Sequence, residues 1–132
     1  MTSAEFENQF LVNFAKNINR KKLKKKHVIK TFNRDYYLWN LFGCGLLPCL
    51  SGNEAREEYD KVDKNEAFEI QYDNGFVGDE ATLPLSQEHM TSAGIDTSRL
   101  AEFYVVGKEF SWCYVVTHEF DRSGPFFCYK PQ

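Results

Sequence analysis

The chain has 132 residues, a formal net charge of −3 and a hydrophobic fraction of 42%. This length predicts one domain over residues 1–132 with a single core, and no apolar run approaches the roughly 20 residues that a membrane-spanning helix needs. Charge is unevenly distributed: residues 1–52 hold nine Lys and Arg against three Asp and Glu (net +6), and residues 53–132 hold seven against sixteen (net −9). The sequence therefore predicts one basic face and one acidic face.

The N-terminal segment is predicted to form an amphipathic helix that runs to about Lys26. Thr2 and Glu5 have the spacing of a capping box, in which two side chains satisfy the first free backbone N–H groups. Apolar side chains then recur at helical spacing: Phe6, Phe10, Phe14 and Ile18. Residues 27–32 fit either a continuation of this helix or a short extended segment.

Two further helices are predicted before the middle of the chain. Residues 36–42 are apolar on several sides, as in a buried helix, and Gly43, Gly45 and Pro48 are predicted to end it. Residues 54–60 are polar and are predicted to form a short exposed helix.

The second half is predicted to be an antiparallel sheet of about four to five strands. Residues 68–72 alternate between apolar and polar side chains, and residues 73–75 (Asp-Asn-Gly) favour a tight turn into a return strand at 76–77. A short helix is expected at 87–92. Three β-branched and aromatic runs then predict strands at residues 102–106, 110–117 and 126–129.

These elements indicate an α+β fold, with N-terminal helices packed on a C-terminal antiparallel sheet. Residues 1–60 are expected to be mainly helical and basic. Residues 67–130 are expected to be mainly β and acidic.

Three motifs in these segments suggest a family. They are Tyr37-Leu38-Trp39-x-x-Phe42, Cys49-Leu50-x-Gly52-x-x-Ala55, and Tyr104-Val105-Val106-x-Lys108-x-Phe110-x-Trp112-x-x-Val115-x-Thr117-His118-Glu119 followed by Gly124-Pro125-Phe126-Phe127. In these motifs the chain resembles a family of short bacterial proteins described as a domain of unknown function, over residues 37–127. It departs from that family at Asn40, where the family tends to have His, and at residues 121–123, where a Trp-Cys-like approach to Gly124 is replaced. The resemblance implies a fold and no chemistry.

The strongest catalytic candidate is the pair His118 and Glu119 at the end of a predicted strand. A histidine beside a carboxylate can act as a general base. However, adjacent strand residues point to opposite faces, so these two side chains are not expected to form a dyad, and a structural role for His118 is favoured. The sequence also has no Gly-rich phosphate loop, nucleophile elbow or metal-binding helix motif. We therefore predict no catalytic residues and expect a protein that is not an enzyme.

The cysteines offer a second possible site. Cys44, Cys49, Cys113 and Cys128 could supply zinc thiolates, but their spacing lies outside the common CxxC pattern. The N-terminus has no apolar signal-peptide segment, so we expect a cytoplasmic protein whose cysteines are reduced and mostly buried. No metal and no cofactor are predicted.

A lysine-rich run covers residues 20–26 and continues to Lys30. Three interpretations are open: contact with a phosphate backbone, a solvated helix end, or an intramolecular contact with the acidic half. No aromatic residue interrupts the run, and the rest of the chain is acidic, so binding of nucleic acid is the less favoured interpretation.

The remaining feature is an acidic and aromatic surface suited to a protein partner. Its predicted partner-binding residues are Asp73, Asp79, Glu80, Glu109, Trp112, Tyr114 and Asp121. Carboxylates steer basic partners, and Trp and Tyr commonly anchor interfaces. The leading hypothesis is an immunity protein that binds a cognate bacterial competition toxin, such as a basic nuclease domain, without a membrane partner. The main alternative is a small enzyme or small-molecule binder with a pocket near His118 and Glu119.

Overall fold

The computed structural model describes residues 1–32, 35–72, 81–100, 102–117 and 124–132. Its centre is a six-stranded antiparallel sheet with the strand order β1-β6-β5-β4-β2-β3. The strands are β1 Leu50–Ser51, β2 Phe68–Gln71, β3 Leu83–Pro84, β4 Phe103–Val106, β5 Trp112–Val116 and β6 Phe126–Tyr129. The predicted α+β class is confirmed, with slightly more strands than expected because β1 and β3 are too short to show periodicity.

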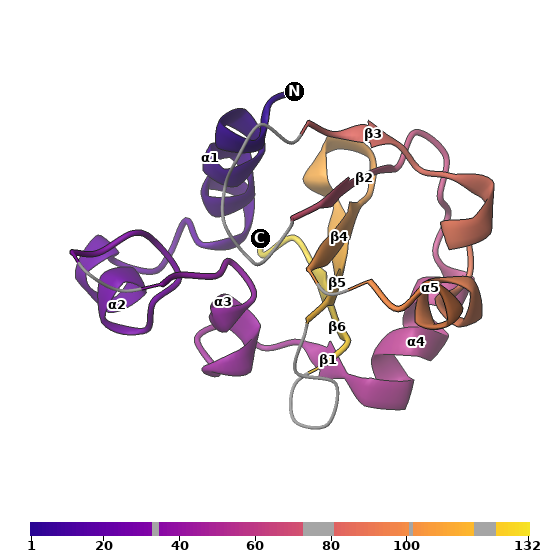
Figure 1. Ribbon diagram of the computed structural model, residues 1–132. Helices are drawn as coiled ribbons and strands as arrows, with labels where there is room; N and C mark the ends of the chain where they lie inside the picture. Colours follow the sequence, from indigo (N-terminus) through magenta and orange to yellow (C-terminus); the bar gives the residue numbers. More distant parts are fainter. Residues whose placement is uncertain (33–34, 73–80, 101, 118–123) are drawn as a thin grey trace.

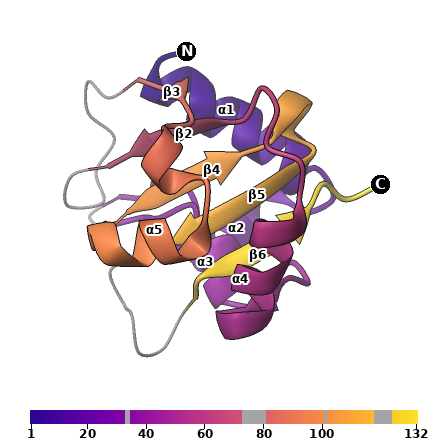
Figure 2. The same ribbon diagram turned by 90° about the vertical axis from the view of Figure 1, so that its right-hand side faces the viewer.

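The sheet lies between two layers of helices (Figures 1 and 2). One face is covered by α1 (Ser3–Phe14) and α3 (Asn40–Gly43), with α2 (Arg20–Lys25) farther out on the same side, and the other face by α4 (Gly52–Lys61) and α5 (Ser92–Ser98). Every residue of β4 and β5 is buried as a result. A strand that is covered on both faces reads as a continuous apolar run, which is the pattern of the C-terminal sequence.

The N-terminal capping box is confirmed, but the predicted length of the first helix is wrong. Thr2 Oγ1 accepts a hydrogen bond from Glu5 N at 3.1 Å, and Glu5 Oε1 accepts one from Thr2 N at 3.0 Å. α1 ends at Phe14, and α2 begins after Asn19, whose side chain accepts a hydrogen bond from Lys22 N at 2.9 Å. A second N-cap therefore divides the predicted helix in two.

The other predicted helices are present with changed bounds. α3 covers only the end of residues 36–42 and stops at Gly43, as predicted. The polar helix expected at 54–60 is α4. In place of one helix at 87–92 there are a 3-10 turn, η1 (Gln87–His89), and α5, because the Thr91 side chain caps a new helix through Gly94 N.

The predicted strands around residues 68–72, 102–106, 110–117 and 126–129 are confirmed as β2, β4, β5 and β6. A 3-10 turn, η2 (Lys108–Phe110), connects β4 to β5. The predicted turn at 73–75 and return strand at 76–77 lie outside the described residues. Within the described chain, β2 pairs with β3 and β4.

Aromatic side chains dominate the core on both faces of the sheet. Under α1, the rings of Phe6 and Phe10 each lie 5.8 Å from the ring of Tyr104. Under α4, Tyr59 stacks on Tyr114 with ring centroids 4.2 Å apart. The high aromatic content thus fills two thin cores, one on each side of the sheet.

Candidate functional site

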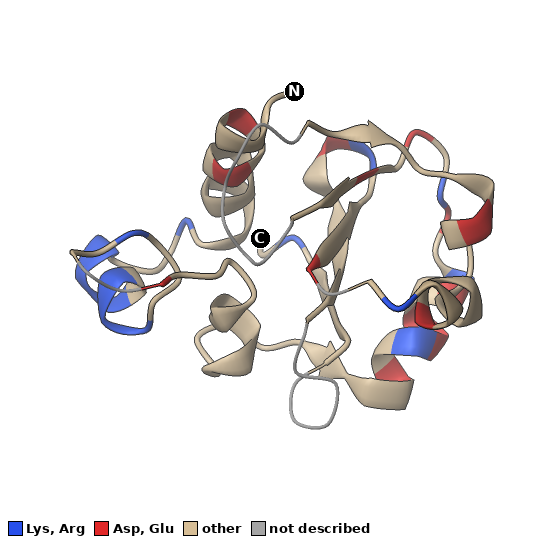
Figure 3. Ribbon diagram, in the orientation of Figure 1, with Lys and Arg blue, Asp and Glu red and all other residues tan. Residues whose placement is uncertain are grey.

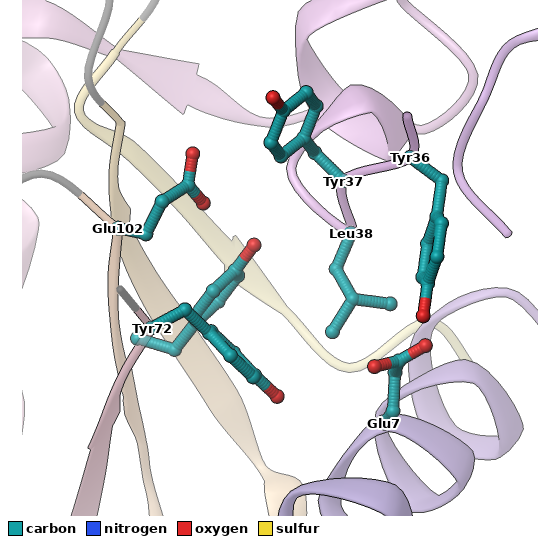
Figure 4. A pocket seen from close by; sticks show the side chains of 7 residues that line it. Glu7, Tyr36, Tyr37, Leu38, Tyr72 and Glu102 are labelled. Atoms are coloured by element: carbon teal, nitrogen blue, oxygen red, sulfur yellow. The ribbon is translucent and has the colours of Figure 1, made fainter. Parts of the chain in front are cut away.

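A small polar cavity lies between α1, the segment before α3 and the sheet (Figure 4). It is lined by Glu7, Tyr36, Tyr37, Leu38, Tyr72, Glu102 and Tyr104. Figure 4 shows Glu7 and Glu102 approaching it from opposite sides, with tyrosine rings between them. Its volume is about 10 Å³, which is room for about one water molecule. The cavity cannot hold a substrate without a rearrangement of its walls.

The carboxyl groups of this cavity are poorly solvated. Glu102 is only 1% exposed, and its Oε1 accepts a 2.8 Å hydrogen bond from Trp39 Nε1. Burial raises the pKa of Glu7 to about 7. Burial, and then the charge of Glu7, raise the pKa of Tyr36. A carboxyl group with a near-neutral pKa suits a general acid or base, but the lack of space removes that role here.

A second polar cluster joins β2 to η1. The Glu69 carboxylate lies 3.0 and 3.1 Å from His89 Nδ1 and accepts a 2.7 Å hydrogen bond from Ser86 N. Ser86 Oγ lies 2.8 Å from the same His89 nitrogen, and Tyr59 donates from its hydroxyl to the His89 carbonyl at 2.6 Å. Each group is held by neighbours on another element, so the cluster fixes η1 against the sheet.

The exposed side of α4 carries carboxylates beside an exposed tyrosine, and this surface is the one best suited to bind a protein partner. Glu54 and Glu57 are exposed, and Glu58 accepts a 2.7 Å hydrogen bond from the hydroxyl of Tyr129 on β6. Tyr129 is 53% exposed. We call Glu54, Glu57, Glu58 and Tyr129 the α4 face.

An apolar hollow adjoins the α4 face. Its volume is about 380 Å³, and its walls come from the β1 and β6 edge of the sheet. The lining residues are Pro48, Cys49, Leu50, Phe127, Cys128 and Tyr129. Tyr129 therefore belongs both to the carboxylate cluster and to the rim of the hollow.

The predicted partner-binding aromatics are in the wrong place for an interface. Trp112 is 3% exposed and Tyr114 is 0% exposed. They belong to the core because Tyr59 of α4 stacks on Tyr114, and Phe127 of β6 stacks on Trp112 at 5.7 Å. The continuous apolar character of residues 112–116 was the signal of burial on both faces.

Of the other predicted site residues, the structure places only Glu109, which is exposed in η2. Asp73, Asp79, Glu80 and Asp121 lie outside the described residues, as do His118 and Glu119 of the catalytic alternative. Sequence reasoning missed Tyr129 as a surface aromatic. Its signal was its place at the end of the last predicted strand, next to Lys130 and Pro131.

The four cysteines are free thiols in the structure. Cys113 and Cys128 are directly opposite each other in the β5–β6 register. Burial raises the pKa of Cys49, raises that of Cys128 to about 12, and raises that of Cys113 well above its ordinary value. These three groups are therefore neutral thiols at pH 7, whereas metals bind the thiolate. Among the described residues, no group of three or more His, Cys, Asp and Glu side chains is placed to hold a metal ion.

The cations of the lysine-rich run form a projection at one end of the molecule (Figure 3). We call residues 20–30 the basic lobe. The lobe lies on the α1 side of the sheet, and α4 and α5 cover the opposite face (Figures 1 and 3). The predicted alternative of an intramolecular contact is therefore wrong for the carboxylates of α4 and α5.

Comparison with known proteins gives one match. A family model described as "Domain of unknown function (DUF4275)" matches residues 2–127. No curated protein and no solved structure matches the chain. Within the part of the chain that the structure describes, every helix is too short or too polar to cross a bilayer.

Proposed function

Because the chain belongs to the DUF4275 family, whose description names no activity, we propose a function from its own surface: it is an immunity protein that binds and neutralises a bacterial competition toxin in the cytoplasm. The observation that supports this proposal is the α4 face, where an exposed tyrosine lies between exposed carboxylates and an apolar hollow. A basic toxin domain, such as a nuclease, has the complementary charge.

Tyr129 has the properties of an interface anchor. Its ring is half exposed, and its edge contact with Phe127 at 5.0 Å and the hydrogen bond to Glu58 hold it in one orientation. An ordered aromatic side chain loses little conformational entropy on binding, and such residues contribute much of the energy of many interfaces. The adjoining hollow gives a partner's apolar side chain a place to be buried.

The carboxylates of the α4 face are available to a partner. Arg56 of α4 pairs with Asp96 of α5 at 2.9 Å, and Lys108 pairs with Glu66 at 2.9 Å. Among the described residues, no cation lies within ion-pair distance of Glu54 or Glu57. Unpaired carboxylates around an aromatic anchor would accelerate association with a basic protein and repel acidic ones.

In this mechanism the protein needs no chemistry of its own. The carboxylates occupy or border the groove with which a nuclease binds phosphate, and Tyr129 and the hollow bury apolar surface beside it. Inhibition is then competition with the nucleic acid substrate. The small cavity between Glu7 and Glu102 and the hydrogen-bonded Glu69–His89 cluster then serve only to stabilise the fold.

The test begins with the product of the reading frame adjacent to this gene. That protein should be toxic when expressed alone, harmless when co-expressed with this chain, and bound by the purified chain in calorimetry. We expect Tyr129→Ala to weaken binding at least tenfold. The double variant Glu54→Gln/Glu57→Gln should mainly lower the association rate and its dependence on salt.

The matched control is Phe32→Ala, which removes an exposed aromatic ring from the other side of the sheet. It should bind as the unaltered protein does. Full protection by Tyr129→Ala with unchanged affinity would contradict the assignment of the surface. Absence of both binding and protection would contradict the proposed function itself.

A further inference from the structure

The basic lobe presents seven cations on a convex projection. Arg20, Lys21, Lys22, Lys24, Lys25, Lys26 and Lys30 are all exposed. At 100° per residue, the side chains at 20–22 and 24–26 surround α2 on every side except the one that holds Leu23, which is buried. Figure 3 shows this positive end separated by the sheet from α4 and α5, while α1, on the same side as the lobe, carries Glu5 and Glu7.

The lobe is built to hold this shape. Leu23, Val28 and Ile29 belong to the core under α1. The carbonyl of His27 accepts hydrogen bonds from Tyr37 N and from Asn40 Nδ2, each at 2.9 Å. These contacts attach the end of the lobe to the segment before α3, so the cations stand on an ordered support.

Two opposing effects act on the stability of α2: cations in its last turn, Lys22, Lys24 and Lys25, interact favourably with the helix dipole, and like charges one turn apart repel each other. Arg20 and Lys24, Lys21 and Lys25, and Lys22 and Lys26 are like-charge pairs at i,i+4 spacing, and each such pair costs about 0.2–0.5 kcal/mol. Among the described residues, no carboxylate lies within ion-pair distance of any cation of the lobe. The lobe therefore carries a repulsion that an external anion would relieve.

The acidic side of the molecule does not cancel this field. Each packed layer adds about 10 Å, so the α4 carboxylates lie roughly 20 Å away across the sheet. The Debye length is about 8 Å at physiological ionic strength. An anionic ligand bound at the lobe is therefore screened from the α4 carboxylates. The acidic composition of the second half of the chain does not prevent such binding.

We propose that the basic lobe binds the phosphate backbone of double-stranded DNA, in addition to the proposed protein partner of the α4 face. A helix about 10–12 Å across fits a major groove about 12 Å wide. Cations on both flanks of α2 would then meet phosphates on both walls of that groove. A flat anionic membrane meets only one flank of a convex lobe, so the duplex is the better match.

The release of counterions from DNA sets how steeply the binding constant should fall with salt concentration. If about five of the seven cations contact phosphates, the slope of log Kobs against log[salt] is about −4.5. Removal of four of the seven leaves one to three of these contacts, so the slope should fall to between about −0.9 and −2.7. Phe32 is 91% exposed two residues after Lys30, and its removal should leave the slope unchanged because it carries no charge.

The experiment measures fluorescence anisotropy of a labelled 20-base-pair DNA duplex with the full-length protein between 50 and 200 mM NaCl. The test variant is Lys22→Gln/Lys24→Gln/Lys25→Gln/Lys26→Gln. Its matched control is Lys61→Gln/Arg99→Gln/Lys108→Gln/Lys130→Gln, which has the same net charge but loses exposed cations outside the lobe. Circular dichroism melts verify that both variants are folded.

The proposal is supported if the unaltered protein and the control variant bind the duplex, while the lobe variant loses at least 90% of the affinity and has a slope shallower by about 2 to 4. Equal binding by all three proteins overturns it, as does an absence of binding at 50 mM NaCl. A parallel sedimentation assay uses phosphatidylserine–phosphatidylcholine vesicles, and binding to vesicles but not to the duplex also overturns it. Toxin binding by the lobe variant is measured separately, so failure here is distinguishable from failure of the proposed immunity function.

Discussion

Trp39 Nε1 donates a 2.8 Å hydrogen bond to Glu102 Oε1, and this contact joins the segment before α3 to the start of β4. Both side chains are almost fully buried, at 5% and 1% exposure. When a buried carboxyl group loses a hydrogen-bond donor, less of its desolvation cost is offset. The pair therefore holds the α1–α3 layer at a defined place on the sheet.

We expect Trp39→Phe to lower the free energy of unfolding by at least about 2 kcal/mol, because the indole N–H donor is lost and the smaller phenyl ring fills less of the core. Urea denaturation followed by circular dichroism measures the change. Glu102→Leu, which has no acceptor, and the double variant complete a thermodynamic cycle that measures the coupling between the two side chains. A coupling indistinguishable from zero would show that the hydrogen bond adds nothing to stability.

The raised pKa of Glu7 predicts a dependence of stability on pH. Its pKa rises from an ordinary 4.5 to about 7 in the folded protein. The folded state therefore binds more protons than the unfolded state between these values, and the contribution of Glu7 to stability is lost as pH rises through this window. Glu7→Gln should raise the melting temperature relative to the unaltered protein at pH 8, with little or no gain at pH 4.

Scanning calorimetry at the two pH values tests this prediction. Glu54→Gln, on the opposite side of the sheet, reports the effect of removing one exposed carboxylate. An equal gain in melting temperature for Glu7→Gln at both pH values would contradict the assignment of the proton to Glu7.

We expect that only glycine is tolerated at position 107 without loss of stability, because the Trp112 ring lies against its Cα atom. A Cβ atom at Gly107 would overlap Nε1, Cε2 and Cδ1 of the Trp112 ring. Overpacking of a buried ring costs about 1–3 kcal/mol, so Gly107→Ala should destabilise the protein by this amount in urea denaturation. Adding Trp112→Phe should cost less in the Gly107→Ala background than alone, and strict additivity of the two changes would refute the proposed clash.

Because Glu69 is hydrogen-bonded to His89 and Gln71 is exposed, we expect alanine substitutions at these two positions of β2 to change the free energy of unfolding by very different amounts. Glu69→Ala removes the acceptor used by His89 Nδ1 and Ser86 N, and should cost about 2–3 kcal/mol of unfolding free energy. Gln71→Ala, two residues further along β2 on the same side but exposed, should change it by less than about 0.5 kcal/mol. Similar losses in the two variants would mean that the cluster is not a stabilising contact.

The sequence was sufficient for the elements whose signal is local. The capping box of Thr2 and Glu5 requires only residues three apart, and the strand at 112–116 requires only β-branched and aromatic side chains. Both were predicted and are present. The division of the first helix was missed because Asn19 caps α2 in a stretch whose apolar spacing continues to Ile18.

The candidate site was predictable only in part, because exposure depends on packing between distant segments. Trp112 and Tyr114 are strand aromatics in the sequence, and only the placement of α4 over β5 and β6 shows that they are inaccessible. Tyr129 and Glu58 lie 71 positions apart. No local pattern brings them together, so the α4 face emerges only from the tertiary structure.

The shortness of the two outer strands has a consequence for behaviour in solution. β1 and β3 have two residues each, and β3 ends in Pro84, which has no backbone N–H to donate. Long unpaired edges are templates on which a second chain can add a strand and begin aggregation. Because the two edge strands are so short, a strand from a second molecule has few free backbone groups to pair with. The sheet edges therefore give this aromatic-rich protein little opportunity to aggregate by strand addition.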